Sequence, residues 1–484
     1  MRQTDSSIFS DTLRYSSSNL CKQLLGVVAT FLRPRLLTAH EFGLWCLLAL
    51  IPFYSEHLHF GSLSSLRLRL AELRNRGRRA ASLRTTTFLG SLVPNLVLAA
   101  GLLIAALVCS DGQLRTGLLL SIPIVLLSWW LGYEYVLLKA ELDFKLISRT
   151  NYLRALVLFL LTIILLPLFG FTGALVAVLL ALAAACGFVF RLRPTRTRGR
   201  FDWQEYLALL REGFPLLGID MMVLLARTAD RLVIAAMIGT AEVGIYAIGG
   251  MIIGFLMNVP GAAREVTEPR LMQDFDSLPY GDFIEEYYCR PLFHSALLVP
   301  LITGSCWLVL PVFIRIVLPQ YSAALAPARV LVLSSYFLAL YLPMRGLMFS
   351  HGWQDRSLLT AMAVLLANLV GNVLVIRLGS GLTGVALVSG ATFFLLFVSE
   401  NLLTLRRFRN SLALSPGRRF YLGLLSFPLS LCLLLVLEHW VGGGRNGELL
   451  ISGLRLLLFV LCWMAFLALA WWPLHRNHLV GRNR

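Results

Sequence analysis

The sequence has little charge for its length, and acidic residues are the scarcest charged type. Charged residues make up 14% of the 484 residues, with 26 Asp and Glu against 43 Lys and Arg. Soluble domains contain about 25% charged residues, so this composition excludes a soluble enzyme and a disordered protein. Most of the rest is apolar, since 57% of the residues are hydrophobic and the mean hydropathy is +0.75. A multi-pass membrane protein accounts for both properties.

Long polar segments are missing as well. A helix needs about 20 apolar residues to cross a bilayer, and about fourteen such windows leave connections of roughly 13 residues, too short for a folded domain. The predicted spans are 11–32, 43–63, 88–109, 116–137, 151–168, 173–190, 213–236, 243–265, 291–317, 325–348, 357–377, 381–404, 420–440 and 450–473. Runs such as 156–166 lack the alternation of barrel strands. We therefore expect an all-α polytopic membrane protein.

The formal net charge of +17 is unusual for a membrane protein and raises the question of nucleic acid. With the N-terminus in the cytoplasm, 31 of the 43 cations fall on the cytoplasmic side and 8 on the outer side, and four lie inside spans. The positive-inside rule then places both termini in the cytoplasm and explains most of the charge without nucleic acid. Residues 1–18 lack the continuous apolar core of a signal peptide, so the first span is kept as structure.

Clustered cysteines are absent too. The eight cysteines are scattered, with no CxxC pattern and no Cys/His cluster. We expect them to be small packing residues, and we expect no metal site, disulfide or bound cofactor.

Two pairs of segments indicate an internal duplication. Residues 38–45 and 240–246 both contain Glu, an apolar residue, Gly, an apolar residue and an aromatic residue, at an offset of 201. The turns at 171–174 and 382–385 match at an offset of 211. Six spans return the chain to the same side, so the repeats are parallel, as in transporters built around a central cavity.

This duplication sets the predicted domain organisation. We expect an N-terminal six-helix lobe, a cytoplasmic linker with an interfacial helix, a C-terminal six-helix lobe, and two further helices with a cytoplasmic tail. Their ranges are 1–190, 191–212, 213–404 and 405–484. Asp202 with Glu205, and Asp282 with Glu285, fit capping patterns for interfacial helices.

Several short segments resemble Wzx-type oligosaccharide flippases of the multidrug/oligosaccharidyl-lipid/polysaccharide exporter superfamily. They read Arg-Tyr-Ser-Ser-Ser-Asn at 14–19, Pro-Arg-Leu-Leu at 34–37, Glu-Phe-Gly-Leu-Trp at 41–45, Gly-Phe-Pro-Leu-Leu at 213–217, Asp-Arg-Leu-Val-Ile at 230–234 and Val-Gly-Ile-Tyr at 243–246. The resemblance covers nearly the whole chain through diffuse motifs. It implies flipping of an undecaprenyl-diphosphate-linked oligosaccharide across the bacterial inner membrane for O-antigen, capsule or exopolysaccharide assembly, with polysaccharide polymerase machinery as a partner.

Four cations inside spans are the candidate diphosphate ligands. Arg14 and Lys22 share one face of the first helix, and Arg227 and Arg231 lie on the seventh, which the duplication makes equivalent. Arginine presents a planar fork to phosphate oxygens and lysine a point charge. The alternatives are that Arg14 snorkels to the surface, and that an Asp230–Arg227 pair only locks helix packing.

Acidic and amide side chains at membrane depth form a second set of candidates. Buried acids can exchange protons as their exposure changes, so Glu56, Glu134, Asp220, Asp230 and Glu265 could couple transport to H⁺ or Na⁺. Amides could contact sugar hydroxyls, and the candidates are Asn19, Asn95 and Asn258. Structural hydrogen bonds are the alternative for both sets.

Other function classes stay open. A drug or metabolite exporter would share the superfamily and its architecture. An integral-membrane polymerase or ligase would need a long outer loop, and the outer segments 318–324 and 441–449 are too short. A structural scaffold does not explain cations inside spans. We therefore predict a transporter without catalytic residues.

Overall fold

The protein is all-helical in a computed structural model, over the residues that the structure describes. These are 26, 29–72, 77–193, 199–258, 260–261, 271, 279–350, 354–412, 424–440 and 448–481. No strand occurs among them. The predicted all-α fold class is confirmed.

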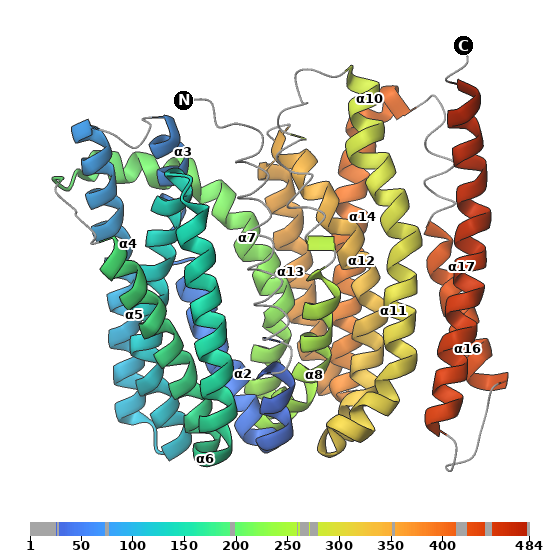
Figure 1. The fold of residues 1–484 in the computed structure, drawn as a ribbon, viewed down its shortest axis with the longest axis horizontal. Coiled ribbons are helices and arrows are strands. Elements are labelled where there is room, and N and C mark those ends of the chain that lie inside the picture. The colour runs from blue at the N-terminus through green and yellow to red at the C-terminus, as the bar shows by residue number, and fades with distance from the viewer. Residues whose placement is uncertain are drawn as a thin grey trace. The chain divides into compact units, whose positions relative to one another are not determined.

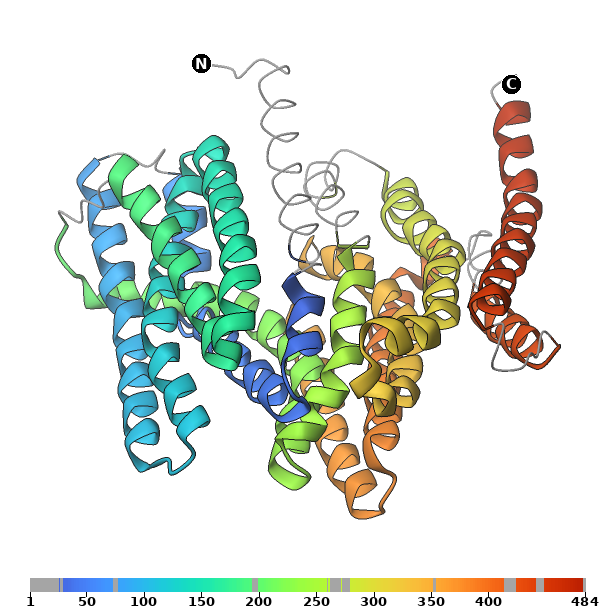
Figure 2. The same ribbon diagram turned by 60° about the horizontal axis from the view of Figure 1, so that its bottom comes forward.

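Met1–Gly244 forms one compact unit. Its helical segments are residues 29–36, α2 (Ala39–Ser55), α3 (Ser62–Glu72), α4 (Gly77–Val108), α5 (Gly112–Ala140), α6 (Phe144–Leu192), α7 (Trp203–Met237) and the start of α8 (Thr240–Leu256). Helix α5 packs against α2, α4 and α6, and α7 packs against α3 and α4. Helices α4 and α5 run side by side in both views (Figure 1, Figure 2).

Helix α6 is two spans joined at a kink. A straight helix of its 49 residues would be about 74 Å long, far more than the hydrocarbon thickness of about 30 Å. Gly170 adopts φ 54° and ψ −132° and interrupts the helix, a conformation that glycine tolerates. Figure 1 shows α6 folding back on itself near its label. The predicted spans 151–168 and 173–190 are therefore separate, with their break at Gly170.

Helix α2 is shorter than the predicted span 43–63. It begins with a capping box, in which the Thr38 side chain accepts from the Glu41 N–H and the Glu41 carboxylate accepts from the Thr38 N–H. It ends at Ser55, and Phe60 and Gly61 adopt positive φ before α3 begins. The predicted boundary at residue 63 is wrong because Leu58 and Phe60 stand among the polar residues of the turn, so the hydropathy does not mark the end of the helix.

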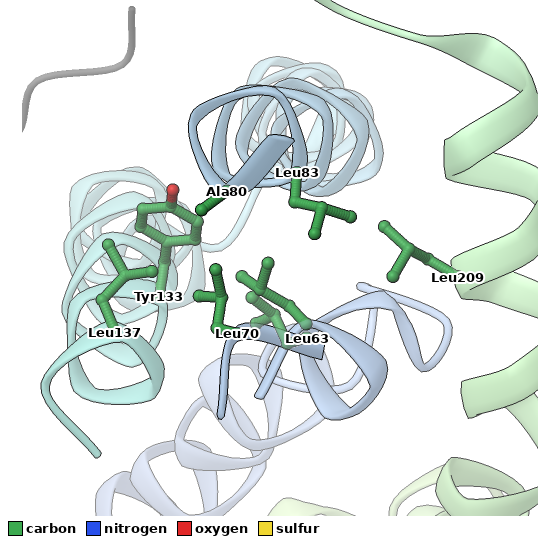
Figure 3. Close-up of a cluster of buried hydrophobic side chains, with 8 residues drawn as sticks. Leu63, Leu70, Ala80, Leu83, Tyr133, Leu137 and Leu209 are labelled. Carbon is green, nitrogen blue, oxygen red and sulfur yellow. The ribbon is translucent and has the colours of Figure 1, made fainter. Parts of the chain in front are cut away.

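One apolar cluster fixes where α7 starts. It joins α3, α4, α5 and α7, and its buried members are Leu63, Leu66, Leu70, Ala80, Leu83, Tyr133, Leu137 and Leu209 (Figure 3). The Tyr133 hydroxyl also donates to the Arg84 carbonyl at 3.0 Å. The first turns of α7 are thus held to the bundle by apolar packing.

Scarce acids serve as helix caps in this unit. Asp111 accepts backbone N–H groups at the start of α5, Asp143 does so for α6, and Asp202 does so for α7. Each satisfies donors that the helix itself leaves unpaired. The predicted cap at Asp202 is confirmed, but the helix that it starts continues without a break into the predicted span 213–236 as α7.

Ile245–Arg484 forms the second compact unit. After the rest of α8, it contains α10 (Tyr280–Ile284), a π-helical turn (Glu285–Cys289), α11 (Arg290–Val317), a 3₁₀ turn (Pro319–Ala324), α12 (Leu325–Ser350), α13 (Gln354–Arg377), α14 (Gly381–Leu412), α16 (Ser426–Trp440) and α17 (Glu448–Gly481). Helix α12 packs on α11 and α14, and α11 also contacts α16 and α17. The segment predicted as a second interfacial helix leads straight into α11.

The surfaces of these helices are apolar where a soluble protein would be polar. Eight helices are long and apolar enough to cross a membrane, among the described residues. Large apolar side chains are well exposed, for example Val97 at 67%, Val108 at 83% and Leu168 at 69%. Contiguous apolar exposure on this scale marks a membrane-facing surface. The protein is a multi-pass membrane protein.

Candidate functional site

The predicted cations of α7 lie together near the end of that helix. Arg227 is exposed and Arg231 is half-buried, and the two guanidinium groups act on each other electrostatically. Asp230 is buried, and its carboxylate accepts the backbone N–H of Arg231 at 2.8 Å. No Asp230–Arg227 ion pair occurs in the described structure, so the packing-lock alternative has no contact to support it.

Several predicted site residues fall outside the described residues. Arg14, Asn19, Lys22 and Glu265 lie there, as does the side chain of Asp220, although its backbone is part of α7. Their roles stay predictions.

Glu56 lies at the end of a helix, in the turn between α2 and α3. It is the C-cap residue of α2, is exposed, and donates its backbone N–H to the Pro52 carbonyl at 3.1 Å. The turn after it is ordered by His59, which is buried and whose Nδ1 accepts from the Gly61 N–H at 3.0 Å. The sequence predicted a helix through Glu56, whereas α2 ends one residue before it, and the coupling role of Glu56 stays a prediction.

Glu134 and Asn95 are placed in the interior. Glu134 of α5 and Asn95 of α4 are fully buried. The Asn95 Nδ2 donates to the Ser91 carbonyl at 2.9 Å, while the Ser91 hydroxyl accepts from Trp129 Nε1 at 3.1 Å. Asn95 thus bonds within its own helix, and its role as a sugar contact stays a prediction. Asn258, just after α8, is half-buried.

Polar groups also meet inside the second unit. Asn368 of α13 donates to Thr392 Oγ1 of α14 at 2.7 Å, and Asn372 donates to Asn368 at 3.1 Å. Glu400 of α14 is buried and accepts from the Ser357 hydroxyl. Sequence reasoning missed Glu400, since it stands near the end of a span, next to several arginines.

The starts of α2 and α8 touch through equivalent glycines. A Cβ on Gly43 would lie 1.7 Å from the Thr240 carbonyl oxygen, and one on Gly244 would lie 2.2 Å from that of Ala39. These residues are related by the offset of 201, so each segment makes the same contact with the other, as in a two-fold interface. His40 Nδ1 and Thr240 Oγ1 are 2.5 Å apart at the same junction.

An arginine that sequence reasoning assigned to the outer surface is buried beside this junction. Arg33 is only 6% exposed, and its guanidinium carbon lies 4.3 Å from the ring centroid of Trp45 on α2. Cys46, next to Trp45, is buried and within electrostatic reach of both Arg33 and Arg231. No sequence signal marks this contact, because twelve residues separate Arg33 from Trp45 across the start of α2.

More than half of the chain matches one known protein family. Residues 34–318, more than half of the chain, match the family described as "Polysaccharide biosynthesis protein". No curated protein sequence matches the chain.

Solved structures show the same fold at low sequence identity. The structure of "Lipid II flippase MurJ, inward closed conformation" matches with a TM-score of 0.71 at 14% identity, over 94% of this chain and 98% of that one. An inward-facing "multidrug resistance MATE family transporter of the MOP superfamily" matches with a TM-score of 0.64 at 14% identity, over 83% and 96%. Both solved structures are of membrane transport proteins, and the likeness shows that this chain has their fold.

Proposed function

The chain belongs to the polysaccharide biosynthesis protein family, and from this premise we propose that it flips an undecaprenyl-diphosphate-linked oligosaccharide across the bacterial inner membrane. The observation that carries the proposal is the family match of residues 34–318 on a chain with the fold of a lipid II flippase. Lipid II is named there as the substrate of that other protein. The substrate class is carried over to this chain as part of the proposal.

The cations of α7 support an anionic lipid as substrate. Arg227 and Arg231 stand one turn apart, a like-charge arrangement that disfavours the helix on its own. A diphosphate offers more negative charge than one nearby acid. With Arg14 and Lys22 of the predicted first helix, these residues form our proposed diphosphate-binding set.

The remaining assignments follow from the predicted topology. Both termini lie in the cytoplasm, the substrate enters from that side, and a polysaccharide polymerase receives it outside. Coupling to H⁺ or Na⁺ runs through carboxylates, for which the candidates are Glu56, Glu134, Asp220, Asp230 and Glu265. The sugar contacts are Asn19, Asn95 and Asn258.

The test is a flipping assay with the purified full-length chain in proteoliposomes. A fluorescent undecaprenyl-diphosphate oligosaccharide is followed by its accessibility to a membrane-impermeant quencher, with imposed proton or sodium gradients as separate arms. We expect movement that depends on the protein and accelerates with one gradient. A protein that leaves this lipid in place and exports cationic dyes instead would be a drug exporter, the alternative that the MATE likeness raises.

The site is tested in the same assay. Arg231→Gln removes a charge that an anionic head would meet and should lower the flipping rate about tenfold or more. Arg211→Gln removes an exposed charge from the same helix and should leave the rate unchanged. Equal rates for both variants would exclude Arg231 from the diphosphate site.

A further inference from the structure

Arg33 is a buried cation, and no acid of the described segments pairs with it. Its side chain packs over Trp45, its Nε is shielded from solvent without a hydrogen-bond partner, and it has no ion pair with any acid among the described residues. A buried charge without a counter-charge or hydrogen bonds destabilises a fold. Stacking on an indole compensates only part of that cost. An anionic ligand bound to the Arg33 guanidinium would compensate the rest of this free-energy cost.

A second guanidinium approaches the same part of α2. The Nε of Arg231 is also shielded from solvent without a hydrogen-bond partner. The neighbouring carboxylate of Asp230 accepts the backbone N–H of Arg231. Both Arg33 and Arg231 act electrostatically on the thiol of Cys46. Arg33 packs on Trp45, the neighbour of Cys46, and α7, which carries Arg231, contacts α2. The two cations thus come from two segments of the first unit that both pack on α2.

This convergence differs from the other ion pairs of the unit. Elsewhere in the unit, Glu141 binds Arg84 at 3.2 Å and Arg193 at 2.5 Å, and Glu212 binds Arg69 at 2.9 Å. Acids are scarce in this chain, yet they are placed beside these half-exposed arginines. The described structure places none on the guanidinium of the more deeply buried Arg33.

We infer that Arg33 and Arg231 bind a lipid-borne phosphate group next to Cys46, beside the junction of α2 and α8. Two planar forks suit the several oxygens of a phosphate or diphosphate, and low dielectric strengthens the attraction. On the predicted topology this end faces outward, because it follows the first span. Resting on the proposed function, the site holds the substrate diphosphate at the side of release, and Arg33 adds to the four cations of the proposed set.

The first experiment measures lipid binding to the intact protein in detergent by native mass spectrometry. The probes are undecaprenyl diphosphate, phosphatidylglycerol and a neutral lipid, diacylglycerol. We expect Arg33→Met to bind the phosphate-bearing probe about tenfold to a hundredfold more weakly. The affinity of Arg33→Lys for this probe should lie between the affinities of Arg33→Met and the wild type. Arg35→Gln, which removes an exposed charge two residues away, should bind normally. Whichever of the two anionic lipids binds the wild type more tightly identifies the source of the phosphate.

A second readout separates binding from structure. Removing an uncompensated buried charge stabilises a protein, so the ligand-free Arg33→Met variant should melt at the same or a higher temperature than wild type. If Arg33 served only to pack on Trp45, this variant would melt lower and bind the anionic lipids as wild type does, and the inference would be overturned.

The flipping assay separates this site from the proposed function. A protein that flips the lipid-linked oligosaccharide but shows no effect of Arg33→Met would refute this site alone, whereas a protein that never flips it would refute the proposed function.

Discussion

Two arginines of this protein stack on tryptophans in nearly the same way, one in each unit. Arg33 lies 4.3 Å from the ring centroid of Trp45, and Arg329 of α12 lies 4.2 Å from that of Trp307 on α11. Arg329 also donates to Glu438 of α16 at 3.0 Å. No acid among the described residues pairs with Arg33, although it is the more buried of the two.

The difference separates a structural arginine from a binding one. Glu438 comes from α16, and its backbone carbonyl also accepts from Arg455 of α17 at 3.3 Å. The charge of Arg329 is therefore neutralised by Glu438, in a contact that holds α16 and α17 to α11 and α12. Arg33 has no such partner in the part of the chain that the structure describes, which leaves its charge for an anion that arrives from outside the fold.

The largest effect should come from giving Arg33 the acid that it lacks. Cys46→Asp places a carboxylate of similar volume within reach of Arg33 and Arg231, so it should neutralise the site before any lipid phosphate arrives. We expect the flipping rate in proteoliposomes to fall at least about a hundredfold while the melting temperature is kept or raised. Cys46→Asn is the matched control because it has the same shape without the charge. Normal flipping by Cys46→Asp would end the assignment of Arg33.

The reverse change makes Arg329 resemble Arg33. Glu438→Gln removes the acid and leaves a partly buried cation, so we expect the second unit to lose about 1–3 kcal/mol of stability. The measurement is thermal or denaturant unfolding in detergent, together with the flipping assay, where the rate should stay close to wild type. Adding Arg329→Met to Glu438→Gln should recover part of the loss. A variant that unfolds normally but stops flipping would show that Arg329 binds substrate too.

The same contrast shows what the sequence could predict. The spans were accessible because hydropathy is a local property, and even the hairpin inside α6 follows from length and Gly170. The end of α2 was not predictable in this way, because Leu58 and Phe60 within the turn after Ser55 keep hydropathy from marking it. Arg231 was found as a charge inside an apolar run. Arg33 was counted as an outer-surface residue, because its burial depends on how Trp45 folds back over it.

The smallest effect should come from the two tryptophans themselves. An arginine over an indole contributes about 0.5–2 kcal/mol, so the coupling energy between Arg329 and Trp307 should fall in that range. It is measured by a double-mutant cycle with Trp307→Leu and Arg329→Met in unfolding experiments, where leucine keeps the apolar contact. The matching cycle with Trp45→Leu and Arg33→Met should give a similar coupling energy, because the two stacking distances are alike. Alone, however, Arg33→Met should not destabilise, since its unpaired charge offsets the stacking. A large loss from Arg33→Met in this cycle would make the two arginines equivalent and would assign both to structure.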